Sequence, residues 1–417
     1  MASLPINAPA DGFEHLWNIT WVRDSAYAIR GLTTAGFYDE AEAALRFFVQ
    51  AGKSGEYAGD EYLYGVDDYV LSVCRVYGDG SEWSDDDGTG PNIEFDNFGL
   101  YLWALGEYTD AAGTGLLMDE LDWDGKKRSF GNIVFDGVAD VLVALVDDNG
   151  LISPDSSIWE RHWDGHQQQF TYTSAWAVRG LREAAEMATT LGDDRATTYK
   201  ATADLIAAAM SKHLINGSDV LVSSLEQLEG SEGILDLAAV DAFNSGALDI
   251  DGQVGSASLA AWMDGLAVES GHGFARNDDS TGQFSYDGQE WVMVDLRLAE
   301  ALRRACRIDE AQGIEDWIAN QALANHLIIP ELMTPDDADY AGPAPMMGFG
   351  SGLYLLTLHN RDLINCTGDT DTDNDNDTDS AGTNSDSDVR RCRCGSGSTG
   401  GSMAILVVLV LIWRRRQ

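Results

Sequence analysis

Glu160 lies in a sequence context that favours acid–base chemistry. It belongs to the segment Pro154–His162, follows Trp159, and precedes a run of residues that predicts a helix. A neighbouring indole desolvates a carboxyl group and favours its protonated form, as a proton donor at neutral pH requires. Arg161 and His162 act in the opposite direction, so the sequence alone does not fix the balance. The ordinary alternative for a single glutamate is a solvated surface position.

A second segment, Trp17–Ser25, places Arg23 and Asp24 after Trp21 and before another helical pattern. Taken alone, Asp24 is explained by capping that helix. Arg23 does not fit this explanation, because a cation at a helix N-terminus faces the positive end of the helix dipole. An Arg–Asp pair between tryptophans suits hydrogen bonding to the hydroxyls of a sugar ring.

The elements that must position these residues are helices. From about residue 24 to residue 360, apolar residues recur at helical spacing and are interrupted by loops rich in Gly, Asp, Ser and Asn. A chain of helical hairpins of this length predicts an all-α fold, a two-layer (α/α)6 toroid whose loops at one end form the pocket. The predicted helices are 24–35, 38–51, 64–77, 96–109, 131–147, 171–190, 192–214, 235–246, 255–268, 290–305, 308–324 and 347–359.

The charge of the chain excludes one class of partner. Its formal net charge is -43, from 26 Lys+Arg against 69 Asp+Glu. Nucleic acid requires a basic surface, so we expect no nucleic-acid partner, and a neutral substrate fits better. The ordinary explanation of the acidity is solubility, or life in a saline or extracellular setting, rather than a direct role in binding. The 12 Trp exceed what a core needs, and stacking on sugar faces is one further use for them.

Several segments together resemble one enzyme family. Thr20-Trp21-Val22-Arg23-Asp24-Ser25 resembles the substrate-binding motif of the glucoamylases, glycoside hydrolase family fifteen. Ser157-Ile158-Trp159-Glu160 resembles the segment of that family that carries the general acid, and Ile329-Pro330-Glu331 resembles the segment with the general base. The segments from Gly273 to Trp291 and from Glu94 to Leu100 resemble two further motifs, with Asn277 and Glu94 replacing the usual Tyr and Gln. Phe349 stands where the family usually carries a Trp.

The resemblance implies a role for each matching residue. Glu160 and Glu331 are the expected catalytic pair, and the expected substrate-binding residues are Trp21, Arg23, Asp24, Asp96, Trp159 and Arg276. Asp96 is explained equally well by capping its own helix. No metal site or organic cofactor is expected for this chemistry. The family's ring begins with a helix before the first motif, so we expect this ring to lack its first helix.

The expected reaction is hydrolysis of an α-glucosidic bond with inversion, which releases glucose from oligo- or polysaccharides. It requires the two carboxyl groups to stand about 6.5–9.5 Å apart, so that a water fits between them. Trehalase and glucodextranase activities remain alternatives within the enzymes. A non-catalytic surface carbohydrate-binding protein derived from this fold remains the alternative from another class.

The C-terminal part differs in composition from the rest. We expect a catalytic domain over 1–365, a disordered Asp/Thr/Asn-rich linker over 366–389, and a sorting or membrane-anchor segment over 390–417. The last segment combines cysteines, an apolar run from Met403 to Trp413 and three arginines, an order that resembles bacterial surface-sorting signals. A plain membrane anchor is the alternative. Either places the folded domain on the extracytoplasmic side of a bacterial envelope, although residues 1–5 are not a signal peptide. We also expect the protein to be a monomer.

Cysteine spacing indicates no zinc or redox motif. Cys74 and Cys306 lie within apolar helical patterns, which predicts buried thiols, whereas Cys366, Cys392 and Cys394 belong to the tail.

Overall fold

The computed structural model describes residues 19–364, with gaps at 52–56, 58–62, 67, 87, 89, 161–164, 229–233, 270, 279–286, 337 and 342–347. All of these residues belong to the compact unit Met1–Cys366. The predicted linker and sorting segment, 366–417, lie outside the described residues, as do residues 1–18. No helix in the described ranges is long and apolar enough to cross a membrane.

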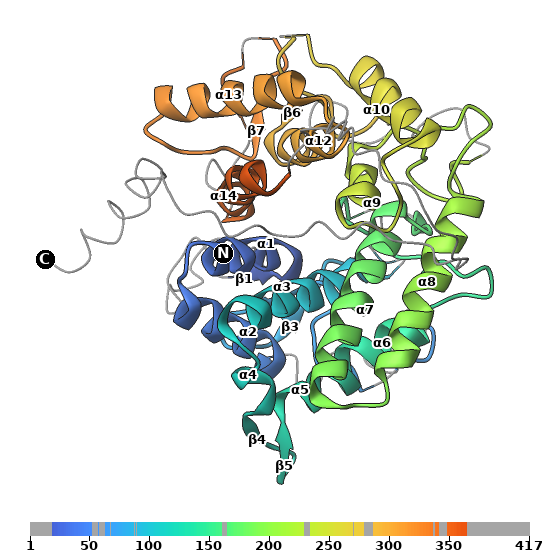
Figure 1. Ribbon diagram of the computed structural model, residues 1–417, viewed down its shortest axis with the longest axis vertical. Helices are drawn as coiled ribbons and strands as arrows, with labels where there is room; N and C mark the ends of the chain where they lie inside the picture. Colours follow the sequence, from blue (N-terminus) through green and yellow to red (C-terminus); the bar gives the residue numbers. More distant parts are fainter. Residues whose placement is uncertain are drawn as a thin grey trace, which may run out of the picture. The chain divides into compact units, whose positions relative to one another are not determined.

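The helices form two layers, and the inner layer closes into a ring (Figure 1). Around the ring each inner helix packs on the next, and the last packs on the first. This arrangement confirms the predicted toroid. The inner helices are α1 (Val22–Thr34), α3 (Asp96–Ala112), α7 (Thr171–Leu191), α9 (Asp241–Asn244), α12 (Val292–Arg304) and α14 (Gly348–Leu363).

The outer helices connect successive inner ones. One of them is interrupted, because a π-helical turn, η2 (Phe135–Ala139), separates α5 (Phe130–Val134) from α6 (Asp140–Ala144). The other outer helices are α2 (Tyr38–Ala51), α8 (Ala196–His213), α10 (Gln253–Gly265) and α13 (Ile308–Ala324). Two further short helices are α4 (Gly115–Met118) and the 3-10 helix η4 (Leu237–Val240).

Burial distinguishes the two layers. In α2 the buried residues are Ala41, Leu45, Phe48 and Val49, an apolar stripe at helical spacing that faces inward. Its first turn carries acidic residues, which favour the positive end of the helix dipole. Inner helices are buried on nearly every face, α12 from Val292 to Arg303 among them. The core of the protein therefore lies between the two layers and inside the ring.

Glycines allow the closest contacts between inner helices. A Cβ on Gly180 of α7 would stand 2.6 Å from the Cα of Gly99 in α3. A Cβ on Gly31 of α1 would stand 3.0 Å from the Cα of Gly352 in α14. The α3–α7 and α1–α14 contacts are thus backbone to backbone, and larger residues would separate the helices.

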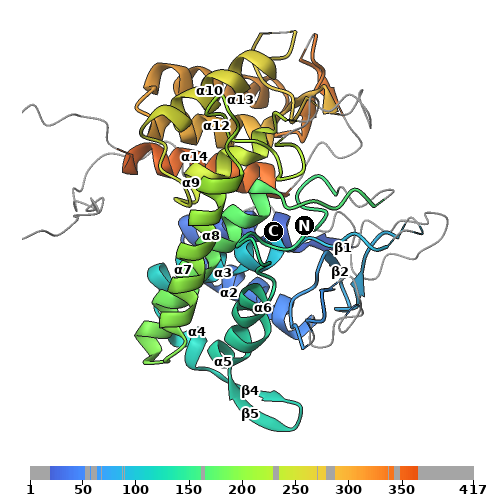
Figure 2. The same ribbon diagram turned by 90° about the vertical axis from the view of Figure 1, so that its right-hand side faces the viewer.

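The strands form three small antiparallel sheets. β1 (Ile19–Trp21), β2 (Arg75–Tyr77) and β3 (Glu82–Trp83) form the first, with Thr20 opposite Val76. β6 (Glu290–Trp291), β7 (Leu332–Met333) and β8 (Tyr340–Ala341) form another. The hairpin of β4 (Glu120–Trp123) and β5 (Lys126–Ser129) extends from the helices (Figure 2). β1 and β6 directly precede the inner helices α1 and α12 and end in Trp21 and Trp291.

The predicted helices agree with the structure except at one place. The prediction of a helix over 64–77 is wrong, because this segment is extended and ends in β2. Its backbone bonds to distant partners, with Val70 N donating to Gly137 O at 3.0 Å and Glu94 N donating to Val73 O at 2.7 Å. Residues 69–76 are all buried, so the apolar spacing reflects burial on every side of an extended chain.

The two described cysteines differ. Cys74 is a buried free thiol, as predicted. The same prediction is wrong for Cys306, which is exposed and disulfide-bonded. Cys306 follows the last turn of α12 with a φ of 57°, so it has left the helical face that packs inward.

Candidate active site

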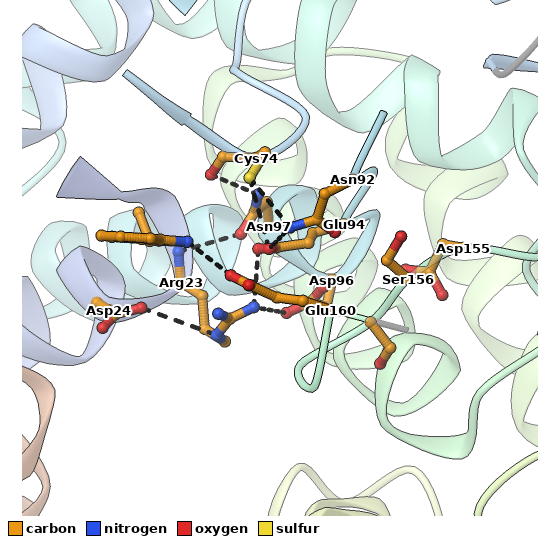
Figure 3. A network of polar contacts seen from close by, with 12 residues as sticks. Arg23, Asp24, Cys74, Asn92, Glu94, Asp96, Asn97, Asp155, Ser156 and Glu160 are labelled. Carbon is orange, nitrogen blue, oxygen red and sulfur yellow. Dashed lines mark hydrogen bonds and ion pairs between the residues drawn. The ribbon is translucent and has the colours of Figure 1, made fainter. Parts of the chain in front are cut away.

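The predicted site residues at the start of the chain gather where two inner helices begin. Arg23 and Asp24 lie in the first turn of α1, and Asp96 is the first residue of α3. The backbone N–H of Arg23 donates to Asn97 Oδ1 at 3.1 Å, which places the two helix starts side by side. Figure 3 shows this group together with Glu160.

Arg23 is surrounded by three carboxylates. Its Nη1 donates to Glu94 Oε2 at 2.7 Å and lies 3.8 Å from Asp96 Oδ2. Its Nε lies 3.8 Å from Asp24 Oδ2. Arg23 is only 8% exposed and the three carboxylate residues are buried, so water screens these charges weakly. The guanidinium is therefore held in one orientation at the mouth of the ring.

Burial shifts the protonation of this cluster. It raises the pKa of Glu94 well above the ordinary value, despite the opposing charge of Arg23. It also raises the pKa of Asp24, and that of Asp96 to about 6. One guanidinium cannot offset three buried negative charges, so the cluster retains protons toward neutral pH.

Glu160 lies on a loop fixed to the segment before α3. Ser156 N donates to Ile93 O at 2.7 Å, and Phe95 N donates to Asp155 Oδ2 at 2.9 Å. Glu160 itself has a φ of 54°, in the left-handed region that a non-glycine residue occupies only where surrounding contacts hold it. The indole of Trp21 donates from Nε1 to Glu160 Oε1 at 2.9 Å. The predicted proton donor is thereby attached to the strand that carries the Arg23–Asp24 motif.

An arginine that contacts two tryptophans forms the next part of the site. The guanidinium carbon of Arg276 lies 4.6 Å from the ring centroid of Trp159 and 4.6 Å from that of Trp291. Arg276 also pairs with Asp287. Trp159 Nε1 donates to Asp236 Oδ1 at 2.9 Å, and this bond fixes the ring of Trp159. Such stacking is favourable for a partly desolvated guanidinium and aligns the tryptophan that precedes Glu160.

Glu331 joins the same region through the backbone. It directly precedes β7, whose Leu332 pairs with Trp291 of β6. Its carbonyl oxygen accepts from Val292 N at 3.2 Å, at the start of α12. The Trp159 and Trp291 ring centroids are 5.2 Å apart, so the segments carrying Glu160 and Glu331 adjoin opposite members of one aromatic pair.

Helix capping does not explain the two aspartates. The N-cap of α1 is Trp21 and that of α3 is Phe95, and neither makes a side-chain capping bond. Neither carboxylate oxygen of Asp96 has a hydrogen-bond partner among the described residues, although both are buried. Its charge is directed at Arg23 instead.

Several residues of this region were not among the predicted site residues, and Arg75, Asp236 and Asp287 are three of them. Arg75 stacks on Trp21 at 4.6 Å and on Trp83 at 4.0 Å, and it pairs with Asp85. Asp236 and Asp287 hold Trp159 and Arg276, as described above. Asp287 lies in the segment from Gly273 to Trp291, whose resemblance to a family motif could have indicated it. Arg75 and Asp236 follow no motif, and only their tertiary contacts indicate them.

Comparison with known proteins gives a family for this region. The family model "Glycosyl hydrolases family 15" matches residues 92–293. No curated protein sequence matches the chain. Among solved structures, a wild-type glycosidase is similar with a TM-score of 0.62 at 20% identity, over 84% of this chain and 89% of that one.

Two glucoamylases are also similar in structure. The glucoamylase of Saccharomycopsis fibuligera has a TM-score of 0.63 at 14% identity, over 84% of this chain and 87% of its own. A bacterial glucoamylase complexed with acarbose has a TM-score of 0.59 at 14% identity, over 82% and 48%. At these identities the likeness establishes the shared helical ring. With the match over 92–293, which includes Glu94, Asp96 and Glu160, the chain carries a domain of the glycosyl hydrolases of family 15.

Proposed function

We propose that this glycoside hydrolase cleaves α-glucosidic bonds with inversion and releases glucose, with Glu160 as general acid and Glu331 as general base. The observation that carries the proposal is the hydrogen bond from Trp21 Nε1 to Glu160 Oε1. It attaches the acid candidate to the motif that contains Arg23 and Asp24, so that one region holds a proton donor and groups suited to sugar hydroxyls.

The proposed reaction uses both glutamates once. Glu160 Oε1 accepts from Trp21, so the proton for the leaving oxygen is carried on Oε2. Glu331 takes a proton from a water, whose oxygen attacks the anomeric carbon as the glycosidic bond breaks. Glu160 ends ionised and Glu331 protonated, and exchange with solvent restores both. Arg23, Asp24 and Arg276 are proposed to orient the sugar, with Trp159 beside it.

Packing inside the ring supports release of single sugar units. Below the site, Tyr27 contacts Trp103 and Trp176 edge to face, with ring centroids 5.6 and 6.0 Å apart. Tyr27 and Tyr172 share a hydrogen bond at 3.2 Å between their hydroxyls. These four rings, named here the aromatic plug, pack together inside the ring, and we propose that they restrict a polysaccharide to entry by one end of the site.

A substrate panel tests the proposal. The full chain is incubated with starch, dextran and trehalose, and released glucose is followed together with its anomeric configuration. Release of β-glucose from starch supports the proposal. Preference for trehalose or dextran would assign the alternative specificities, and maltose binding without glucose release would assign a carbohydrate-binding protein.

Replacing each glutamate by glutamine tests their roles. We expect Glu160→Gln and Glu331→Gln each to lower kcat by about 10²–10⁴-fold, because each removes one proton transfer while keeping side-chain shape. KM should change little. Glu120→Gln, on the exposed β4–β5 hairpin, serves as the matched control. Near wild-type kcat in both site variants would contradict the assignment.

We propose that the protein is extracytoplasmic and acts as a monomer held at a bacterial envelope by residues 390–417. The disulfide of Cys306 supports an oxidising compartment, because cytosolic thiols are kept reduced. Fractionation of cells that produce the full chain tests the proposal. Recovery in the soluble cytosol would contradict the location, and release by deletion of 390–417 would support the anchor.

A further inference from the structure

Two buried carboxyl groups adjoin the strand that carries Trp291. Glu290 is the first residue of β6, and Asp295 lies in the first turn of α12. Both residues have an exposed fraction of 0%. Their carboxyl groups are hydrogen-bonded to each other. Such a bond requires a proton on one of the two groups, because an ionised carboxylate only accepts.

One oxygen of each carboxyl group has a donor of its own. Trp317 Nε1, on α13, donates to Glu290 Oε1 at 2.8 Å. The backbone N–H of Phe274 donates to Asp295 Oδ1 at 3.0 Å. The other two oxygens, Glu290 Oε2 and Asp295 Oδ2, are buried and have no donor among the described residues. A proton carried by one carboxyl group supplies the donor that they require.

The surroundings of the pair favour this proton over a second negative charge. His272 faces Glu290 from the preceding loop, and its exposed ring stacks on Trp317 with centroids 4.0 Å apart. α13 contributes the Trp317 indole, and β7 lies beside Glu290 with the apolar Met333. Burial raises the pKa of Glu290, and burial together with the charge of Glu290 raises the pKa of Asp295. A doubly ionised pair would therefore be strongly unfavourable here.

The pair also joins the two segments that carry Arg276 and Trp291. A Cβ on Gly273 would stand 2.5 Å from Glu290 Oε1, so the loop before Arg276 packs directly on this carboxyl group. Trp291 N donates to Phe274 O at 2.9 Å, which attaches the same loop to β6. The guanidinium carbon of Arg276 lies 4.6 Å from the ring centroid of Trp291. The position of Arg276 on that ring therefore depends on the contact between loop and strand.

We propose that Glu290 and Asp295, named here the acid pair, are positioning residues that share one proton. The acid pair holds Arg276, which is proposed to orient the sugar, against Trp291. When the pair releases its proton to solvent, two negative charges face each other without water, and the loop and the strand must separate to solvate them. The shared proton is a property of the fold, whereas its effect on substrate binding rests on the proposed function.

Amide variants test for the shared proton. Glu290→Gln keeps Oε1 for Trp317 and supplies an N–H to Asp295, and Asp295→Asn supplies one to Glu290 in return. Each single variant therefore keeps the bond with a donor that does not titrate. The double variant brings two NH2 groups together, and rotating either amide only moves the conflict to the N–H of Trp317 or Phe274. We expect its Tm to be a few °C below that of either single variant, and its KM for starch at pH 5 to be about tenfold higher.

The pH dependence separates the acid pair from ordinary packing. Because both pKa values are raised, the stability linked to the protonated form is complete below the ordinary values and is lost as pH rises through the folded-state values. From pH 5 to 9 we expect the Tm of the wild type to fall relative to Glu290→Gln, and its KM to rise relative to that variant. Glu269→Gln makes the same change at an exposed position ahead of the loop, so this matched control should follow the wild type.

Several outcomes would overturn the proposal. One is a double variant as stable as the single ones, and another is the same pH dependence of Tm in the wild type and Glu290→Gln. A wild-type Tm that rises with CaCl2, with no rise in Glu290→Gln, would show that a cation rather than a proton joins the carboxyl groups. A double variant with lowered Tm but wild-type KM would refute the positioning of Arg276.

The readouts separate this proposal from the proposed function. Tm requires no substrate, so a chain that does not hydrolyse starch would contradict the proposed function and leave the test of the shared proton intact. In that case the affinity for maltose, measured by titration calorimetry, replaces KM as the readout of positioning.

Discussion

Arg23 is the residue on which the start of the candidate site converges, since Asp24, Glu94 and Asp96 all face its guanidinium. Glu94 also accepts from Asn92 Nδ2 at 2.9 Å and lies 3.6 Å from the Cys74 thiol. It is the member of the cluster in which this sequence differs from the usual Gln of the family. A neutral side chain of the same shape is therefore a direct probe of the cluster.

We expect Glu94→Gln to raise Tm relative to the wild type, and to raise it more as pH increases from 5 to 8. Burial places the pKa of Glu94 above its ordinary value of about 4.3. The stability linked to its neutral form is complete below that ordinary value and is lost as pH rises through the folded-state pKa. Glutamine does not titrate. Differential scanning calorimetry measures the difference, and a gap between the two proteins that stays constant with pH would contradict it.

Trp21 is expected to act by positioning Glu160. Trp21→Phe keeps a ring beside Arg75 but removes the N–H that holds Glu160 Oε1. We expect kcat to fall about tenfold with little change in KM, since one hydrogen bond to the acid is lost. Trp83→Phe is the control, because it changes the other tryptophan beside Arg75 to a phenylalanine and leaves the bond from Trp21 to Glu160 in place. A purely structural role would lower Tm in both variants and leave kcat of the folded enzyme unchanged.

The sequence locates the motifs but not their contacts. Arg23 and Asp24 can be recognised beside Trp21, because neighbouring residues define that segment. The three carboxylates around Arg23 cannot be predicted from the sequence. Glu94 and Asp96 lie far from Arg23 along the chain, with a separation of 71 residues for the bond to Glu94. Arg75 could not be found for the same reason, since nothing near it in the chain indicates its place between two rings.

Among the elements, α3 and α7 make the closest contact of the ring through Gly99 and Gly180. Helical spacing predicts both helices, since each carries a long regular apolar pattern. It does not predict the extended segment 64–77, because a chain buried on every side shows no alternation that would distinguish it from a buried helix. The observed limits equal the predicted ones in two helices with a solvated face, α2 and α13. In α8 and α10, which also have a solvated face, the limits differ by up to four residues.

We expect Gly180→Ala to lower the free energy of unfolding by about 1–3 kcal/mol, because its methyl group would meet backbone that cannot rotate away. Gly313→Ala is the matched control in α13, where an added Cβ has no neighbour within 4 Å. That change should be neutral or stabilising by up to about 1 kcal/mol through helix propensity. Urea unfolding measures both. Equal stability of the two variants would show that α3 and α7 can separate at little cost.

At the scale of the whole molecule, the net charge of -43 opposes the compact state. Spreading the charges by unfolding relieves their repulsion, and added salt screens it, with a Debye length of about 10 Å at 0.1 M and about 3 Å at 1 M. We therefore expect Tm to rise with NaCl between these concentrations. Sucrose at matched viscosity separates this effect from general solvent exclusion. A Tm that is flat or falls with salt would show that local ion pairs outweigh the net repulsion.

The contact between α1 and α14 joins the first and the last inner helix of the ring. While the chain is being made on the ribosome, α1 emerges early and must wait for its neighbour until nearly all other helices exist. Glu331 and α14 also emerge after the other inner helices, whereas Arg23 emerges before them. Until α14 has emerged, a nascent chain therefore has neither a closed ring nor a complete pair of candidate catalytic glutamates, and its activity should appear only after that point.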